Sequence, residues 1–318
     1  MGRINTYGLP MTFFKLKAKA KDTEPAETGP GKSVFFSAPD GLKLHAVEYG
    51  GENGDALPVI CLAGLSRNSR DFERLAIFLS EKAAPKRRVI CFDYRGRGLS
   101  VHDPDWKNYN VITEAEDVLA GMTALGIAHA AIIGTSRGGL IAMALSAMRP
   151  GALKAVILND VGPVIEGDGL ATIRAMLTQL PKPKNWDEAI AIQKTAMGKA
   201  FPAFSQEDWA FEAHAKYRQI GRKIRPDHDP DLVKPLAEID LGEKLPEMWP
   251  QFIGLTKTPV LLLRGEHSGL LSKKTVEAMS ARHPDMQVME IAGQGHPPLL
   301  HKDGIPEAIE RFLGGVAD

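Results

Sequence analysis

The chain has 318 residues, of which 44% are hydrophobic and 25% are charged, and its 39 lysines and arginines balance 39 aspartates and glutamates. This is the composition of a globular protein with ample apolar material for a core, and the length suits one large α/β domain or two ordinary ones. A formal net charge of zero without a basic cluster gives no electrostatic reason to expect nucleic acid or an anionic membrane as a partner. The expected partners are therefore small molecules or other proteins.

The first residues and the two cysteines indicate where the protein works. Residues 1–32 include the polar stretch DTEPAETGPGK and are expected to form a solvated arm. They lack the apolar middle region of a signal peptide, and no stretch of the chain approaches the ~20 apolar residues that span a bilayer. Cys61 and Cys91 each lie in a strand-like apolar run, which favours buried thiols over a disulfide or metal site. We therefore expect a cytoplasmic protein.

Strands and helices are predicted to alternate from residue 33 onward. KSVFFSAPDGLKLHAVEYGG predicts two strands joined by a Pro-Asp-Gly turn. Six later apolar runs are typical of strands buried on both faces of a parallel sheet: PVICLAG, RVICFDY, HAAIIG, KAVILND, TPVLLLRG and MQVMEIAG. Four stretches between or after them have helical spacing: DFERLAIFLSEKAA, ITEAEDVLAGMTALG, GGLIAMALSAMRP and IPEAIERFLGG. This alternation predicts the α/β class, with a mostly parallel sheet covered by helices on both sides.

One interval interrupts the alternation. Between Asp160 and Thr258 there is no comparable strand, while prolines, charges and helix-like pieces are frequent. Eight large aromatic residues are scattered through this interval: Trp186, Phe201, Phe204, Trp209, Phe211, Tyr217, Trp249 and Phe252. We predict a helical cap over residues 163–250, inserted into a core formed by residues 33–162 and 251–318. Each aromatic residue is expected to belong to the core of the cap rather than to contact substrate.

A serine flanked by glycines marks the candidate site. Gly134, Ser136 and Gly138 form the pattern G-x-S-x-G between a predicted strand and a predicted helix. A sharp turn there projects the hydroxyl above the sheet, and the glycines let neighbouring elements pack close to the turn. The N-terminus of the following helix favours a developing negative charge. A serine that only caps the helix is the alternative, but the strand–turn–helix context favours a nucleophile.

Two backbone N–H groups and a histidine are predicted to lie beside this serine. ICLAGLSRN ends a strand at Gly64, and the turn after it can aim the N–H of Leu65 at Ser136. The N–H of Arg137 would be the second donor of an oxyanion hole. The loop IAGQGHPPLL places His296 at the carboxyl end of the last predicted strand.

Other polar residues near strand ends are given weaker or structural roles. Arg95, in CFDYRGRGLS, is expected to hold its own loop together. His267 and His301 have weaker claims to a catalytic role than the histidine at position 296, and His283 is expected to be solvated.

With these motifs in this order, the chain resembles the α/β-hydrolase-fold enzymes over about residues 35–315. The resemblance implies that Ser136 is the nucleophile and His296 the general base and acid, and that the N–H groups of Leu65 and Arg137 form the oxyanion hole. A serine at this turn argues against the branches of the family in which a carboxylate attacks, the epoxide hydrolases and haloalkane dehalogenases.

The acid of the expected Ser–acid–His set is missing from its usual place. In the family, the acid lies in the loop after the strand that reads PVLLLRG in this chain. That loop reads EHSGLLS here, and Gly269 stands where the resemblance leads us to expect an aspartate. Asp160, at the end of the preceding core strand, is the favoured alternative, although it can equally tie down the base of the cap. Glu266 is the second alternative. The third is that no acid is present, which costs ~10,000-fold in turnover in a Ser-His-Asp enzyme.

The sequence therefore predicts a serine hydrolase that cleaves a carboxylic ester or lactone through an acyl-enzyme, with no metal or organic cofactor. Its partner would be a small ester or acyl substrate. Hydrolysis of a carbon–carbon bond is the alternative chemistry, because relatives that use it often carry an asparagine where Asn68 stands. A non-catalytic binding protein of the same fold is the alternative of another class, favoured by Gly269.

Overall fold

The computed structural model describes residues 30–54, 56–179, 181–240, 242–243 and 245–316. The predicted N-terminal arm lies outside these residues except for its last three, and the first strand already begins at Lys32.

An eight-stranded sheet forms the centre of the molecule, in the order β1-β2-β4-β3-β5-β6-β9-β10. The strands are β1 (Lys32–Ser37), β2 (Lys43–Tyr49), β3 (Val59–Leu62), β4 (Val89–Asp93), β5 (Ala130–Thr135), β6 (Leu153–Asn159), β9 (Val260–Gly265) and β10 (Gln287–Ile291). Only the pairs β1–β2 and β2–β4 are antiparallel, and the remaining pairs are parallel. The predicted hairpin and the six apolar runs thus all form strands of one mostly parallel sheet.

The strand that we predicted from MQVMEIAG does not have two buried faces. Four of the five residues of β10 are exposed or half-buried, and Val288 is 45% exposed. The reason is its position, because β10 is an edge strand that pairs only with β9. The prediction of full burial was wrong for this strand, whereas β3, β4, β5 and β9 are buried along their whole length.

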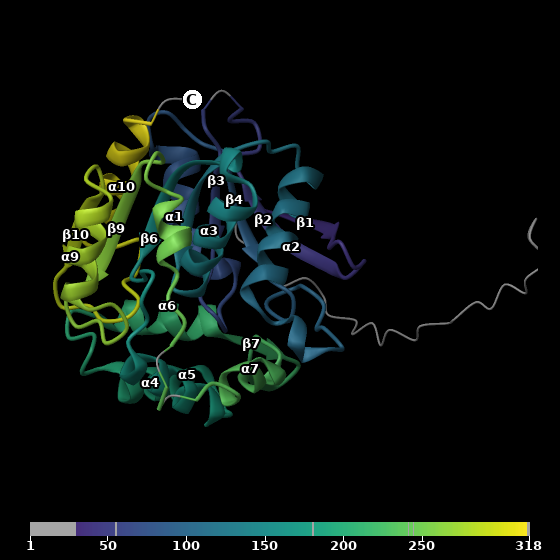
Figure 1. Cartoon of the computed structure of the whole chain (residues 1–318). Helices are drawn as coiled ribbons and strands as arrows, with labels where there is room; N and C mark the ends of the chain where they lie inside the picture. The colour runs from purple at the N-terminus through teal and green to yellow at the C-terminus, as the bar shows by residue number, and fades with distance from the viewer. Residues whose placement is uncertain (1–29, 55, 180, 241, 244, 317–318) are drawn as a thin grey trace, which may run out of the picture.

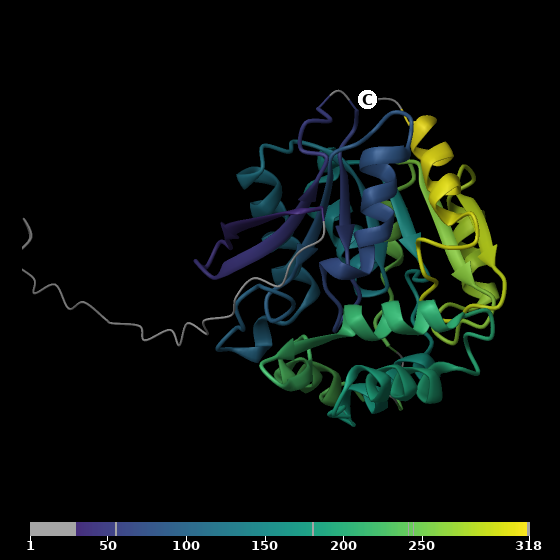
Figure 2. The same ribbon diagram turned by 180° about the vertical axis from the view of Figure 1, so that it is seen from behind.

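Helices cover both faces of the sheet (Figures 1 and 2). α1 (Glu73–Ile77) and α10 (Ile305–Gly314) lie on one face, and α2 (Val111–Ala124) and α3 (Arg137–Met148) lie on the other. The first predicted helix is divided, since α1 follows a 3₁₀ turn, η1 (Ser69–Phe72), and continues into a π-helical turn, Phe78–Lys82. A further helix that was not predicted, α9 (Lys273–Arg282), precedes β10.

Most of the insertion between β6 and β9 lies beyond the end of the sheet to which the parallel strands point (Figure 1). The insertion contains the helices α4 (Gly167–Thr178), α5 (Trp186–Met197), α6 (Gln206–Lys216), α7 (Lys234–Ala237) and α8 (Trp249–Ile253). Its last helix, α8, lies beside the sheet instead, where the carbonyl of Gln251 accepts a hydrogen bond from Oγ of Ser146 on α3. The insertion is not purely helical, because β7 (Tyr217–Ile220) and β8 (Lys223–Pro226) form an antiparallel hairpin. The tight turn of this hairpin uses Gly221 at φ +59°, a conformation that glycine adopts without steric cost.

Aromatic side chains of the insertion pack mainly with one another. Phe201 and Trp209 are buried and form a ring cluster with Phe204, whose ring centroid lies 4.6 Å from that of Phe201. Tyr217 is buried in a separate small cluster beside Ala189 and other apolar side chains. These contacts are those of a small core within the insertion. The expectation was wrong for Trp249 and Phe252, because Phe252 is buried in the main core and Trp249 packs against that core.

Three other expectations concern the core and its surroundings. Cys61 and Cys91 are buried free thiols, as predicted, and face each other in the β3–β4 register. The prediction that His283 is solvated was wrong. His283 follows the last residue of α9 and is buried, and its Nε2 lies 3.0 Å from the carbonyl oxygens of both Leu255 and Thr258. Within the described ranges, the helices are too short or too polar for any of them to cross a bilayer.

Candidate active site

Ser136 occupies the sharp turn between β5 and α3. Its backbone has φ +52° and ψ −112°, a strained conformation for a residue with a side chain. The backbone N–H of Ser136 donates to the carbonyl of Asn159 on the neighbouring strand β6 at 3.0 Å. Its side chain caps no N–H of α3, which removes the structural role that was the alternative to a nucleophile.

The two glycines of the motif are required by close packing. A Cβ atom on Gly138 would lie 2.0 Å from the carbonyl oxygen of Leu62 at the end of β3. A Cβ atom on Gly134 would lie 2.5 Å from the carbonyl oxygen of Gly138. The start of α3 can therefore press against the ends of β3 and β5 only because both positions lack a side chain.

Three side chains from distant parts of the chain meet at this turn. Nε2 of His296 lies 2.9 Å from Oγ of Ser136, and Nδ1 of the same ring lies 2.8 Å from Oδ2 of Asp160. The other carboxylate oxygen of Asp160 accepts a hydrogen bond from the backbone N–H of Gly265 at 2.9 Å. Asp160 is fully buried, whereas the side chain of His296 is 13% exposed. The hydroxyl, the imidazole and the carboxylate thus form one continuous hydrogen-bonded chain.

The other carboxylate considered for this role lies elsewhere. Glu266 accepts a hydrogen bond from the backbone N–H of Gly293 at 2.8 Å, and its Oε2 lies 3.8 Å from Nε2 of His267. Gly269 has open space around its Cα, so that a Cβ atom would meet nothing within 4 Å. The structure therefore brings Asp160, and not Glu266, to the imidazole.

The loop after β3 passes directly beside the serine. A Cβ atom on Gly64 would lie 3.9 Å from Cβ of Ser136. Within the described residues, the N–H of Leu65 donates no hydrogen bond to a protein acceptor, and Arg137, as the first residue of α3, has no acceptor for its N–H inside the helix. Among the described residues, neither N–H group thus has a protein acceptor.

A buried ion-pair network that the sequence analysis missed joins these two residues. Arg97 donates from Nε to the carbonyl of Leu65 at 2.8 Å, and its Nη1 pairs with Oε1 of Glu114 at 2.8 Å. The second oxygen of Glu114 lies 2.7 Å from Nε of Arg137. Burial opposes ionisation of Glu114, but the two guanidinium groups outweigh it and hold the pKa of this carboxyl below its usual value.

One signal in the sequence could have found this network. Glu114 lies on the same face of α2 as the buried residues Ala115, Val118 and Met122. A carboxylate on the apolar face of an amphipathic helix needs a buried partner, and this position was not singled out.

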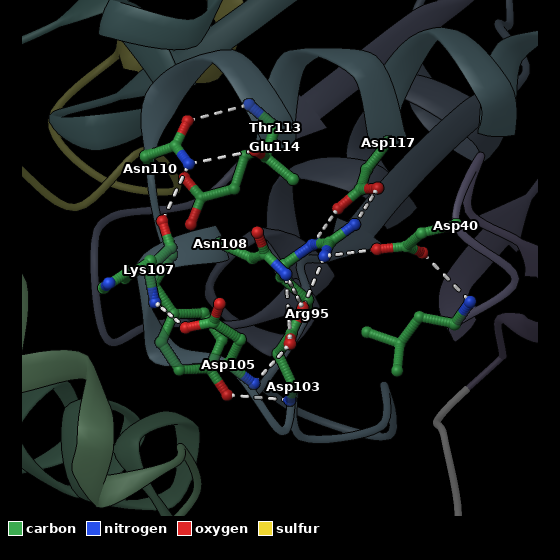
Figure 3. A network of polar contacts seen from close by, with 12 residues as sticks. Asp40, Arg95, Asp103, Asp105, Lys107, Asn108, Asn110, Thr113, Glu114 and Asp117 are labelled. Carbon is green, nitrogen blue, oxygen red and sulfur yellow. Dashed lines mark hydrogen bonds and ion pairs between the residues drawn. The ribbon is translucent and has the colours of Figure 1, made fainter.

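The loop after β4 is held by Arg95, as predicted (Figure 3). Its guanidinium is fully buried and binds Asp117 on α2 through two hydrogen bonds of 2.7 Å. It also pairs with Asp40 and Asp103. In the described ranges, the Arg95 side chain makes no hydrogen bond or ion pair with the serine turn, so its contribution is to fix the loop from which Arg97 reaches Leu65.

The remaining candidates have contacts of their own. Asn68 donates from Nδ2 to the carbonyl of Ala215 at 2.9 Å, and its oxygen caps η1. His301 packs against the ring of Phe211, and burial together with Arg74 lowers the pKa of His301 to about 4. The described residues contain no group of three or more His, Cys, Asp or Glu side chains arranged to hold a metal ion.

Comparison with known proteins places the chain among others of similar architecture. A family model described as "alpha/beta hydrolase fold" matches residues 58–196. A 3-hydroxybutyrate-oligomer hydrolase of Cupriavidus necator is 30% identical over 270 residues, which cover 82% of this chain and 89% of the relative. A 2-(acetamidomethylene)succinate hydrolase of Mesorhizobium japonicum is 27% identical over 249 residues, covering 77% and 83%.

A solved structure agrees with these relatives. The crystal structure of an alpha/beta hydrolase from Novosphingobium aromaticivorans superimposes with a TM-score of 0.83 at 33% identity, covering 90% of this chain and 98% of that one. The chain therefore belongs to the α/β-hydrolase-fold family. The curated relatives that match most of the chain are hydrolases, which supports an enzymatic role.

Proposed function

We propose that this protein is a serine hydrolase that cleaves carboxylic esters through an acyl-enzyme. The observation that carries the proposal is the pair of hydrogen bonds, 2.9 and 2.8 Å long, that connects Ser136 through His296 to Asp160. A serine hydroxyl is a weak nucleophile until an adjacent base takes its proton, and the imidazole lies at the distance that this transfer requires.

Acylation then proceeds through a tetrahedral intermediate. Oγ of Ser136 attacks the ester carbonyl while its proton passes to Nε2 of His296, and the Asp160 carboxylate stabilises the imidazolium through Nδ1–H. The N–H groups of Leu65 and Arg137 stabilise the negative charge on the carbonyl oxygen. When the tetrahedral intermediate collapses, the bond to the alkoxide breaks and His296 protonates the leaving alcohol.

Deacylation repeats these steps with water as the nucleophile. His296 removes a proton from water, the hydroxide attacks the acyl carbon, and the proton returns to Oγ of Ser136 as the carboxylic acid leaves. These steps require no metal or organic cofactor. We further propose that the insertion over residues 163–250 acts as a cap above this site and that the protein works in the cytoplasm.

Similarity to the 3-hydroxybutyrate-oligomer hydrolase supports a particular substrate class, namely short oligoesters of hydroxy acids. These compounds contain the ester bond that the proposed chemistry cleaves. Hydrolysis of a carbon–carbon bond is less well supported, because Asn68, which suggested it, uses its amide to cap η1 and to bind the carbonyl of Ala215. A binding protein without turnover was suggested by Gly269, and Asp160 argues against it because this residue, directly after β6, supplies a carboxylate to His296.

Ester turnover by matched variants tests the proposal. Wild-type protein is expected to hydrolyse a short-chain 4-nitrophenyl ester, and Ser136→Ala is expected to lose at least ~1,000-fold in kcat. Ser280→Ala, on α9 far along the chain from the turn, is the control and should retain wild-type activity. Equal activity of Ser136→Ala and wild type would refute the proposed nucleophile.

A further inference from the structure

Helix α6 of the insertion packs against the loop that runs beside Ser136. Nη2 of Arg67 pairs with Oε2 of Glu212 on α6 at 3.1 Å. The amide of Asn68 and the guanidinium of Arg70 both donate to the carbonyl of Ala215, at 2.9 and 3.0 Å. Figure 1 shows α6 as the helix of the insertion between the core and the α4–α5 layer.

This contact is close to the proposed reacting atoms. The position of a Cβ atom on Gly64 lies 3.9 Å from Cβ of Ser136 and 3.3 Å from Cγ of Arg67. Arg67 therefore lies near the serine turn as well as pairing with Glu212 on α6. Residues four apart on a helix share a face, so Lys216 extends from the same side of α6 as Glu212.

Lys216 differs from the arginines near α6 and the loop after β3 because it forms no direct ion pair among the described residues. Each arginine has a carboxylate partner: Arg67 pairs with Asp71 and Glu212, Arg70 and Arg218 with Asp227, and Arg97 and Arg137 with Glu114. Within the part of the chain that the structure describes, Lys216 makes no ion pair, and its Nζ donates to the side-chain oxygen of Gln193 at 3.1 Å.

A partly buried ammonium group without a counterion is unfavourable. Burial, reinforced by the charge of Arg67, lowers the pKa of Lys216 to about 8, although Glu212 and Asp71 oppose this shift. An anion brought by a ligand would supply the missing partner.

Two buried polar groups, one on the loop after β4 and one on the loop after β8, also lack hydrogen-bond partners among the described residues. Nη2 of Arg97 and Nδ1 of His228 have no hydrogen-bond partner among the described residues, and both side chains are more than nine-tenths buried. The two residues face each other in an isolated β-bridge. Burial and the charges of Arg97 and Lys216 lower the pKa of His228 to about 4.

We propose that Lys216 binds a carboxylate of the substrate, so that the preferred esters are those that carry a free carboxylate group near the ester bond. This inference rests on the proposed ester hydrolysis and narrows its substrate class. The carboxylate would lie between α6 and the loop after β3, where it pairs with Lys216 while the ester carbonyl reaches Ser136.

Two pairs of esters, each with one charged and one neutral member, test this preference. Mono-4-nitrophenyl glutarate and 4-nitrophenyl pentanoate place the difference on the acyl side. 3-Acetoxybutyrate and 3-acetoxybutyramide place it on the alcohol side. For at least one pair, the wild-type ratio of kcat/KM for the charged to the neutral ester is expected to exceed about ten, the effect of one hydrogen bond to a charged group.

Variants then test whether the Lys216 amine causes this preference. Lys216→Met is expected to lower the ratio by about tenfold or more, whereas Lys194→Met, which removes an exposed cation from α5, should leave it unchanged. A wild-type ratio near one for both pairs, or an equal loss on both members in Lys216→Met, would overturn the inference.

Binding measurements keep this test separate from turnover. Glutarate is expected to bind the Ser136→Ala variant in a calorimetric titration, and addition of Lys216→Met to that variant should weaken binding by about tenfold or more. If no ester is hydrolysed but glutarate binding depends on Lys216, the proposed hydrolysis fails and the carboxylate site stands. If esters are hydrolysed but glutarate binding is independent of Lys216, the proposed hydrolysis stands and the carboxylate site fails.

Discussion

The carboxylate of Asp160 lies 2.8 Å from Nδ1 of His296, although 136 positions separate the two residues in the chain. Asp160 follows β6 directly, and β6 lies between β5, which ends at the Ser136 turn, and β9, which precedes Gly269. The residue after β6 thus brings a carboxylate to the imidazole, whereas the loop in which the family usually carries its acid has Gly269.

Asp160→Asn is expected to reduce ester turnover by at least ~100-fold with the fold intact, because an amide does not stabilise the imidazolium as a carboxylate does. Glu266→Gln, which changes the other candidate acid in the same way, should retain wild-type turnover. Measurement of kcat for the two variants distinguishes the candidates. A large loss in Glu266→Gln alone would show that Glu266, and not Asp160, is the acid.

Glu114→Gln is expected to lower kcat by about tenfold or more with a smaller effect on KM, since Leu65 and Arg137 lose their common anchor and oxyanion stabilisation acts on the transition state. It should also lower the free energy of unfolding by about 3 kcal/mol, because two buried guanidinium groups lose their counterion. Glu116→Gln, on the exposed face of the same helix, is the control. Dividing activity by the number of covalently titrated active sites separates the loss of catalysis from the loss of folded protein. An unchanged kcat per active site would show that Glu114 has only a structural role.

Gly138→Ala is expected to destabilise the protein by about 2 kcal/mol or more, because the added methyl would lie 2.0 Å from the carbonyl oxygen of Leu62. Gly151→Ala adds the same methyl where no atom lies within 4 Å, and its effect should stay within about 0.5 kcal/mol. Chemical denaturation of both variants makes the comparison. Equal free energies of unfolding for the two variants would show that the turn at Ser136 tolerates a side chain at position 138.

The ratio of kcat/KM for charged over neutral esters is expected to fall as the pH rises through about 8. The pKa of Lys216 is lowered to that value, so the ammonium is present below it and is lost above it. Because both esters depend equally on His296, the ratio cancels the titration of the base. A ratio that stays constant from pH 6.5 to 9.5, or that changes identically in Lys216→Met, would contradict the assignment to this amine.

Much of the fold was predictable because its signals are local. The β-branched runs became strands, and the G-x-S-x-G pattern lies at a strand-to-helix turn, because periodicity and glycine placement report on the few residues around them. The hairpin β7–β8 carried such a signal as well, since Gly221 and Arg222 form a two-residue turn between its strands, but it was obscured by the expectation of a helical insertion.

The contacts that complete the site depend on strand order, which local patterns do not encode. Asp160 acquires its partners only when β6 lies beside β9 and the loop after β10, and Arg97 and Glu114 pair only when the loop after β4 meets helix α2. For the same reason the burial of His283 and the exposure of β10 were misjudged, because both depend on which elements are neighbours in space.

Covalent labelling is the most direct test of the claim that Ser136 is the nucleophile of an acyl-enzyme. After treatment with a fluorophosphonate probe, mass spectrometry of the intact protein and of its peptides is expected to show one adduct per chain, attached to Ser136, with ester turnover lost in proportion to labelling. Continued ester hydrolysis by a protein that carries no adduct, or an adduct on another residue, would contradict the account.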